Sequence, residues 1–315
     1  MHRASHPLLE ATLKRLEGAY ANATVRAYRA DFENFVGYCF ENGHRALPSE
    51  GIAVAGFVEE LSTSGVKSAS IRRAISAIST IHRVNGFMDP THHIDPLLAM
   101  RRMHRTLGRA AKQANPISND HLRMLMGVCD DSLRGLRNKA MIKVGFDTLC
   151  RRGELVSLDV EDIRPRKILL RRSKTDPYGL GRWLAVSSEG DRLLRMWLTA
   201  AGITRGAIFR GIDAKGELTE RLDPGQPNRI LKSLAQKAGL DYRIISGHSL
   251  RVGAAQDLLL KGASLPTIMQ RGRWSKTDTM MRYLENAPAS DLMNDEGEVD
   301  SEFGPPPTSS NRYPR

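Results

Sequence analysis

The sequence predicts a mostly α-helical fold with a small β-sheet, in which an N-terminal helical bundle precedes a second, mixed α/β domain. Its 315 residues exceed the usual length of one domain. Apolar residues recur at helical spacing in the first third, whereas no strand-like alternation occurs before residue 160. Hydrophobic residues make up 41% and charged residues 26% of the chain, which excludes a fibrous or wholly disordered protein.

Four helices account for the first domain. Either Asn22 or Thr24 caps the first helix, whose apolar residues continue to Cys39. The other three are expected over 52–61, 68–84 and 94–111. The third carries Ile71, Ile75 and Ile78 on one stripe, as expected of a helix with one buried face.

A basic run separates the two domains. It contains Arg101, Arg102, Arg105, Arg109 and Lys112 without an acidic residue, and it leads to the helix-breaking Pro116. Two interpretations stay open: a solvated helix face, or a strap that follows phosphates. The predicted parts are an N-terminal extension (1–19), the helical domain (20–107), a linker (108–116), the mixed domain (117–293) and a Pro/Ser-rich acidic tail without fixed structure (294–315).

The second domain is expected to be mainly helical around one hairpin. Apolar strands over 168–174 and 182–186 flank a turn that contains Pro177 and Gly179. Helices are predicted over 118–129, 134–149, 189–201, 226–238, 247–261, 264–271 and 276–285.

Charge and motif content narrow the function classes. The net charge is +12, but residues 285–315 carry −5 and the rest +17, so a polyanion is the expected partner. Three widely spaced cysteines, no apolar membrane-spanning run and no signal peptide favour the cytoplasm. No phosphate-binding glycine loop or serine-hydrolase elbow occurs. His92, His93 and Asp95 lie between prolines and are interpreted as a turn, so neither metal nor cofactor is expected.

One set of residues in the second half suits phosphoryl transfer. Arg151 precedes Glu154 by three residues at a helix break, and His248 and Arg251 share one face of a helix's first turn. Two arginines can hold the non-bridging oxygens of a phosphate, and a histidine and the indole of Trp274 can donate to it. The hydroxyl of Tyr283 can then attack phosphorus and form a covalent intermediate without a metal. Each element alone is commonplace, but their order and spacing together are specific.

On these residues the chain resembles the tyrosine recombinase (phage integrase) family along nearly its whole length, and within it the Cre-like members. The segments Gly247–Ala255 and Ile268–Gln270 carry the likeness, as does Trp274, where most members have histidine. An indole cannot shuttle a proton, so an acid–base role at this position is unsupported.

The resemblance implies a role for each matching residue. Arg151 and Arg251 are the catalytic arginines, His248 the accompanying histidine, and Tyr283 the nucleophile. Glu154 is the acidic residue that fixes the catalytic residues in place without acting on the phosphate itself. Lys174 on the hairpin is the acid for the departing 5′ oxygen, with Arg172 as a rival. Tyr178 and Tyr242 are the alternative nucleophiles.

The implied activity is site-specific recombination of duplex DNA in a bacterial or phage context. The protein would close around DNA as a clamp, with Arg72, Arg73 and the basic run as DNA-binding residues. Cleavage would give a 3′-phosphotyrosyl bond, and four protomers on inverted-repeat sites would exchange strands through a Holliday junction without ATP or metal. A type IB topoisomerase and a non-catalytic site-specific DNA-binding protein are the alternatives.

Overall fold

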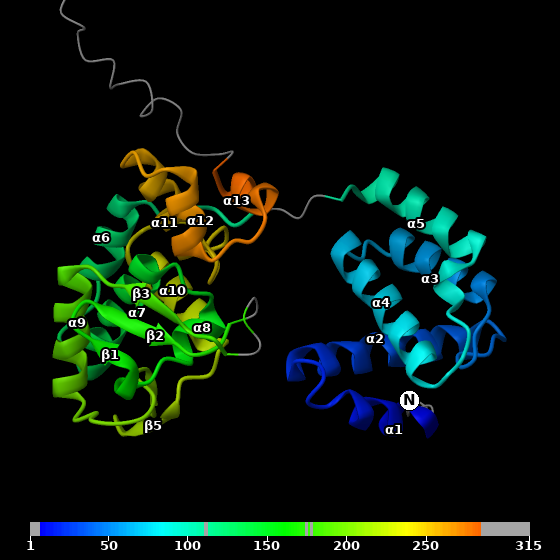
Figure 1. Cartoon of the computed structure of the whole chain (residues 1–315), viewed down its shortest axis with the longest axis horizontal. Helices are drawn as coiled ribbons and strands as arrows, with labels where there is room; N and C mark the ends of the chain where they lie inside the picture. The colour runs from blue at the N-terminus through cyan, green and yellow to red at the C-terminus, as the bar shows by residue number, and fades with distance from the viewer. Residues whose placement is uncertain (1–6, 110–112, 174–175, 177–178, 285–315) are drawn as a thin grey trace, which may run out of the picture. The chain divides into compact units, whose positions relative to one another are not determined.

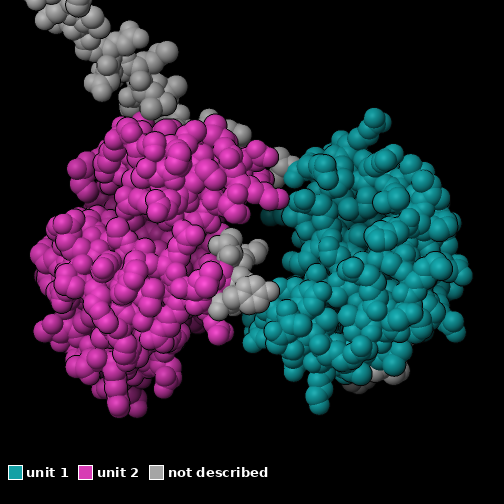
Figure 2. All heavy atoms as spheres, viewed as in Figure 1, with its two compact units in different colours: residues 1–112 teal, residues 113–315 magenta. Residues whose placement is uncertain are grey.

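The fold was described from a computed structural model, which covers residues 7–109, 113–173, 176 and 179–284. The chain divides into two compact units, residues 1–112 and 113–315, coloured separately in Figure 2. Each unit has its own hydrophobic core, and they are described one at a time.

Unit 1 is a helical bundle, as the sequence predicts. Its elements are α1 (Pro7–Leu16), α2 (Asn22–Glu41), α3 (Gly51–Thr63), α4 (Ser68–Val84), a 3-10 turn (Pro90–His92) and α5 (Ile94–Leu107) (Figure 1). Helix α2 packs on α4, and α3 packs on α5. Phe32, Phe35 and Ile78 are fully buried between them, so aromatic and β-branched side chains fill this core.

Helix α1 is an element that the sequence analysis overlooked. It lies within the segment interpreted as an N-terminal extension, yet Leu9, Leu13 and Leu16 are buried in the core of unit 1. Their i, i+4, i+7 spacing is the signal that indicates an amphipathic helix here.

Unit 2 combines helices with two small antiparallel sheets. Its helices are α6 (Asn119–Gly127), α7 (Leu133–Thr148), α8 (Arg152–Val156), α9 (Ser188–Ala200), α10 (Gln226–Lys237), α11 (Ser249–Leu260), α12 (Leu265–Gly272) and α13 (Thr277–Leu284), with a 3-10 turn (Val160–Asp162). Its strands are β1 (Ile163–Arg164), β2 (Lys167–Leu170), β3 (Arg182–Ala185), β4 (Arg210–Ile212) and β5 (Leu218–Arg221) (Figure 1). The predicted fold class, mostly α with a small sheet, is confirmed.

The predicted hairpin supplies two of the three strands of the larger sheet. Strand β2 pairs with β3 in the register Ile168↔Leu184, and β1 extends the sheet on its other side. Ile168 and Leu184 are buried, whereas their neighbours Lys167 and Trp183 are exposed and stack with 4.9 Å between the ammonium and the ring centroid. The second sheet, β4–β5, was not predicted, because each of its strands carries a single large apolar residue and therefore shows no apolar alternation.

Helix α7 is the centre of unit 2. It contacts α6, α9 and α11, and Ile142 and Val144 on it are fully buried. Because it is surrounded, its apolar residues do not keep to one stripe. Its C-terminal end therefore lies inside the unit, where its last carbonyls need donors from other elements. No helix of the described part has the length and apolar character needed to cross a bilayer.

Candidate active site

The site is built on the buried C-terminal end of α7. Leu149 adopts the left-handed conformation (φ 51°), which ends the helix and turns the chain toward Arg151. Arginines from the C-terminal part of unit 2 bind the free carbonyls: Arg251 Nη1 donates to Leu149 O (2.5 Å), and Arg273 Nη1 donates to Thr148 O (3.1 Å). Cations suit this position because the carbonyls and the helix dipole are both negative there.

Arg151 and Glu154 are held together at the start of α8. The Arg151 amide donates to Glu154 Oε2 (3.0 Å), and its Nη1 donates to Glu154 Oε1 (2.6 Å). Burial by itself would raise the pKa of Glu154, but Arg273 and both donors of Arg151 outweigh it, so the pKa is lowered. The Glu154 carboxylate therefore fixes Arg151, whose side chain keeps 27% of its surface exposed.

Arg251 is the most deeply placed charge in the site. Its side chain is 0% exposed, its second terminal nitrogen donates to Gly272 O, and its Nε has no hydrogen-bond partner among the described residues. The ring of Trp274 covers it, with 4.3 Å between the guanidinium carbon and the ring centroid. Burial, and then Arg151 and Arg273, lower the pKa of Arg251 to about 10, and it remains charged at neutral pH. In this geometry the Arg251 guanidinium is therefore closed to an incoming phosphate oxygen.

The Tyr283 hydroxyl lies against the imidazole of His248. It is hydrogen-bonded to His248 Nε2, and the Tyr283 ring packs on Trp274 with ring centroids 5.0 Å apart. Gln256 donates to the carbonyl of Tyr283 (2.9 Å), which ties the end of α13 to α11. Burial, and then Arg251 and Arg151, lower the pKa of His248 to about 4. At neutral pH the imidazole is uncharged and can accept the tyrosine proton.

This pKa predicts how stability depends on pH. Because the imidazole takes up a proton at its ordinary pKa of 6.5 in the unfolded chain but only near pH 4 when folded, the unfolded state binds more protons between these values. We expect the free energy of unfolding to fall as the pH is lowered from 6.5 toward 4, and His248→Gln to weaken that dependence. Urea titrations of both proteins at pH 4.5, 5.5 and 7 measure the free energy of unfolding at each pH. The prediction is wrong if this free energy falls with decreasing pH by the same amount in both proteins.

Gly272 allows Trp274 to fold back over Arg251. A Cβ on Gly272 would lie 1.8 Å from the Trp274 ring, a distance at which the ring cannot keep its present position. We expect Gly272→Ala to destabilise unit 2 by about 2 kcal/mol or more, because the ring must leave its place. Gly127→Ala on α6 is the matched control, since nothing lies within 4 Å of its Cβ position. Chemical denaturation compares the two, and equal stability would argue against the ring placement.

The structure brings together six of the seven residues predicted for catalysis. Arg251, Trp274, Tyr283 and His248 form one series of contacts, and Arg151 pairs with Glu154. Arg273 joins the two groups, because it donates to Glu154 and to Leu149 O, the carbonyl that also accepts from Arg251. Lys174 lies outside the described residues. Close to it, the Asp176 carboxylate accepts the amides of Gly179 and Gly181 (3.1 and 2.9 Å) and shapes the described part of the β2–β3 connection.

The residues predicted to bind DNA all belong to unit 1, and one of them, Lys112, is outside the described residues. Arg101, Arg105 and Arg109 are exposed. Arg73 pairs with Asp31 (2.7 Å), and Arg102 pairs with Glu59, so their charges are partly balanced within the protein. Arg72 is half-buried.

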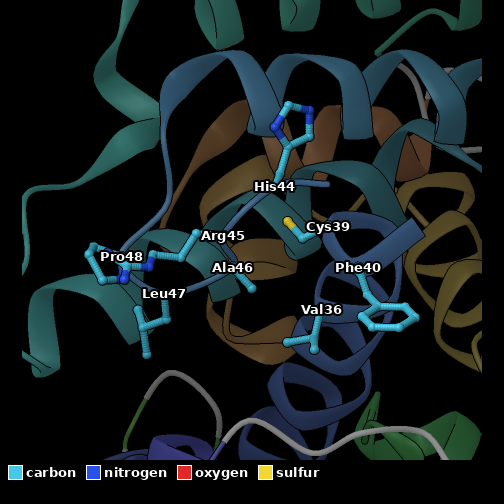
Figure 3. A pocket seen from close by; sticks show the side chains of 8 residues that line it. All are labelled: Val36, Cys39, Phe40, His44, Arg45, Ala46, Leu47 and Pro48. Carbon is cyan, nitrogen blue, oxygen red and sulfur yellow. The ribbon is translucent and has the colours of Figure 1, made fainter. Parts of the chain in front are cut away.

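Sequence reasoning missed Arg273, which contacts Glu154 directly. It appears in the sequence beside Trp274, but only the indole was assigned a role there. Unit 1 also has a hollow beside the C-terminal end of α2, lined by Phe40, Leu47 and Pro48 among others (Figure 3). Most of its lining is apolar, and we assign it no chemistry.

The site places an uncharged histidine on a tyrosine hydroxyl, next to buried arginines with little counter-charge. This arrangement is suited to transferring a phosphoryl group to the tyrosine. Residues 115–290 match the phage integrase family, and residues 12–84 match the phage integrase N-terminal SAM-like domain. The chain belongs to the phage integrase family, which confirms the class of enzyme predicted from the sequence.

Individual relatives agree with this assignment. The chain is 31% identical to an integrase/recombinase XerD homologue of Selenomonas ruminantium over 287 residues, covering 86% of this chain and 84% of the relative. It is 26% identical to the Cre recombinase of Escherichia phage P1 over 293 residues, with 85% of each chain covered. These two names confirm the predicted likeness to site-specific recombinases, Cre among them.

Solved structures show the same fold. XerH site-specific recombinase bound to a palindromic difH substrate matches with a TM-score of 0.66 at 17% identity, covering 90% of this chain and 81% of that one. A lambda integrase dimer bound to a COC′ core site matches with a TM-score of 0.63 at 15% identity, covering 95% and 99%.

Proposed function

We propose that this protein is a site-specific DNA recombinase that cleaves and rejoins duplex DNA through Tyr283. The observation that carries the proposal is the Tyr283 hydroxyl bonded to a neutral His248 beside two charged arginines, Arg151 and the buried Arg251. The relatives named as recombinases support it, as do related structures titled as complexes with DNA sites and, for lambda integrase, as a tetramer on a Holliday junction. We extend DNA binding, inverted-repeat sites and a tetramer to this chain on that basis.

The proposed reaction uses only groups of the protein and the DNA to supply and accept each proton and each leaving group. Tyr283 transfers its proton to His248 Nε2 as its oxygen attacks phosphorus, a 3′-phosphotyrosyl bond forms, and the bond to the 5′ oxygen breaks. Lys174 is proposed to give the 5′ oxygen its proton. Arg151 and Arg251 neutralise the charge that develops on the non-bridging oxygens. A 5′ hydroxyl of the partner strand then attacks phosphorus and gives its proton to Lys174, while the bond to Tyr283 breaks and His248 returns the proton to the tyrosine. The phosphodiester is restored, so the bond energy is conserved and no ATP is needed.

Contact with DNA is proposed to open the site. Arg251 is covered by Trp274, whereas Arg151 is partly exposed, so an incoming phosphate meets Arg151 first. Three guanidiniums, those of Arg151, Arg251 and Arg273, lie near the single carboxylate of Glu154, and their excess positive charge attracts the phosphate. Binding of the phosphate compensates for moving the Trp274 ring. We propose that the two domains meet near residue 112, and that the first of them includes α1, because Leu9, Leu13 and Leu16 are buried in the core of unit 1. We propose a bacterial cytoplasmic setting on the basis of bacterial and phage relatives.

The test begins with a duplex selected by this protein from a random pool. The duplex is nicked near the cleavage site so that the short fragment bearing the released 5′ hydroxyl diffuses away, and mixing it with the protein should trap a covalent protein–DNA adduct. Two such sites with different labels should exchange strands. Supercoil relaxation without exchange would favour the topoisomerase alternative, and binding without any adduct would favour a non-catalytic DNA-binding protein.

Affinity for that duplex should depend steeply on salt. Exposed arginines such as Arg101 and Arg105 are part of the +17 carried by residues 1–284, and each phosphate contact releases counterions. With six or more phosphate contacts, we expect a loss of about 10³-fold or more between 50 and 200 mM salt, measured by fluorescence anisotropy. A flat dependence would contradict extensive backbone contact.

A further inference from the structure

Arg273 occupies a backbone position that ordinarily belongs to glycine. Helix α12 ends with Arg273 N–H bonded to Gln270 O (3.3 Å) and Trp274 N–H bonded to Met269 O (3.0 Å), the hydrogen-bond pattern of a Schellman cap. The residue at this point must be left-handed, and Arg273 has a φ of 58°. A side chain that accepts this strained backbone needs compensating contacts elsewhere.

The compensating contacts lie inside the active site. The guanidinium donates to Thr148 O (3.1 Å) and Leu149 O (3.2 Å) at the end of α7, and to Glu154 Oε2 (2.7 Å) at the start of α8. Its side chain is only 4% exposed. Arg273 therefore bonds to segments about 120 residues away in the chain and is shielded from any ligand in this geometry.

Glu154 is divided between two arginines. Its Oε1 accepts from Arg151 Nη1, while its Oε2 accepts from both the Arg151 amide and Arg273. Because the two oxygens are part of one rigid plane, a bond that fixes Oε2 also sets the direction of Oε1. The orientation of the Arg151 guanidinium thus depends on Arg273 through a single carboxylate.

We propose that Arg273 is a positioning residue for DNA cleavage, which holds the Glu154 carboxylate so that Arg151 faces the scissile phosphate. This inference rests on the proposed function, since it assumes that Arg151 neutralises charge on that phosphate. Arg273 also joins α7 to the turn that carries Trp274, so one side chain sets the spacing between the two halves of the site.

The decisive variant is Arg273→Gly, which removes the guanidinium while relieving the left-handed backbone. At saturating DNA we expect single-turnover adduct formation to slow by about 10²-fold, because a misplaced catalytic group costs about that much. DNA affinity should change by less than about threefold, because the buried Arg273 does not touch DNA. Arg273→Lys keeps the charge and should recover part of the rate.

Arg221→Ala is the matched control. Arg221 also binds a carbonyl, Val156 O (2.7 Å), and a carboxylate, Asp159 (2.6 Å), but at the other end of α8. It should leave the cleavage rate unchanged. Urea denaturation of both variants separates loss of folded protein from loss of rate, and a rate defect that follows the unfolded fraction would overturn the proposal.

Two further measurements separate positioning from general structural support. In a Glu154→Gln background, adding Arg273→Gly should cost less than about threefold, because the path through the carboxylate is already broken. A duplex with a neutral methylphosphonate at the scissile position needs less positive charge, so the defect should shrink there as well. An undiminished defect in both tests would overturn the proposal.

Failure of this inference can be told apart from failure of the proposed function. If the unaltered protein forms no adduct at Tyr283, the proposed function fails. If it forms the adduct and Arg273→Gly forms it at the same rate, only the role of Arg273 is refuted.

Discussion

Tyr283→Phe should abolish the covalent protein–DNA adduct, with a loss of at least about 10⁴-fold. The substitution removes the attacking oxygen and keeps the ring that packs 5.0 Å from Trp274. The substitution also removes the hydrogen bond between the hydroxyl and His248, through which the tyrosine would give up its proton. The duplex should still bind with an affinity within about threefold of the original, because one neutral hydroxyl contributes little to an interface dominated by phosphate contacts.

Denaturing gels measure the adduct, and peptide mass spectrometry locates it. Tyr242→Phe is the control: Tyr242 belongs to the same unit and is 41% exposed, and its loss should leave the adduct intact. If the adduct persists in Tyr283→Phe, then Tyr283 is not the nucleophile, and the mass of the modified peptide decides between Tyr242 and Tyr178.

Arg251→Ala should reduce cleavage by about 10³-fold or more while leaving DNA affinity within about tenfold. The Arg251 guanidinium is the most deeply buried charge in the site that contains Tyr283. Water therefore screens this charge least. The variant also leaves Leu149 O and Gly272 O without this donor, which destabilises unit 2. Arg251→Lys keeps one positive charge in the same space, and it should fold better yet remain strongly impaired, because an ammonium cannot present two parallel donors.

Arg271→Ala is the control for this series. Arg271 likewise binds a carbonyl at the end of α7, Asp147 O (3.1 Å), but it is exposed and has no contact with Tyr283 or Trp274 among the described residues. We expect it to cleave normally. Gross loss of DNA binding in folded Arg251→Lys, measured by gel shift, would assign Arg251 to structure or DNA affinity instead of to catalysis.

Most helices could be predicted from the sequence because their apolar spacing is a local property. The helix predicted over 68–84 matches α4, and the hairpin around Ile168 and Leu184 is present with antiparallel pairing. The prediction missed the three-residue strand β4, whose sequence shows no apolar alternation. It also missed α1, because residues 1–19 were interpreted as an extension without a helix.

By itself, the sequence determined the class of protein and the chemical groups at its disposal. Arg151, His248, Arg251, Trp274 and Tyr283 are recognisable in order and spacing, since each role requires a particular functional group. Only the tertiary structure decided how these groups are connected. The Arg273 bond to Glu154 spans 119 residues and depends on a left-handed backbone, and the cover over Arg251 depends on a glycine that leaves room for an indole. Such contacts follow from where α7 ends inside the unit, which no local pattern in the chain records.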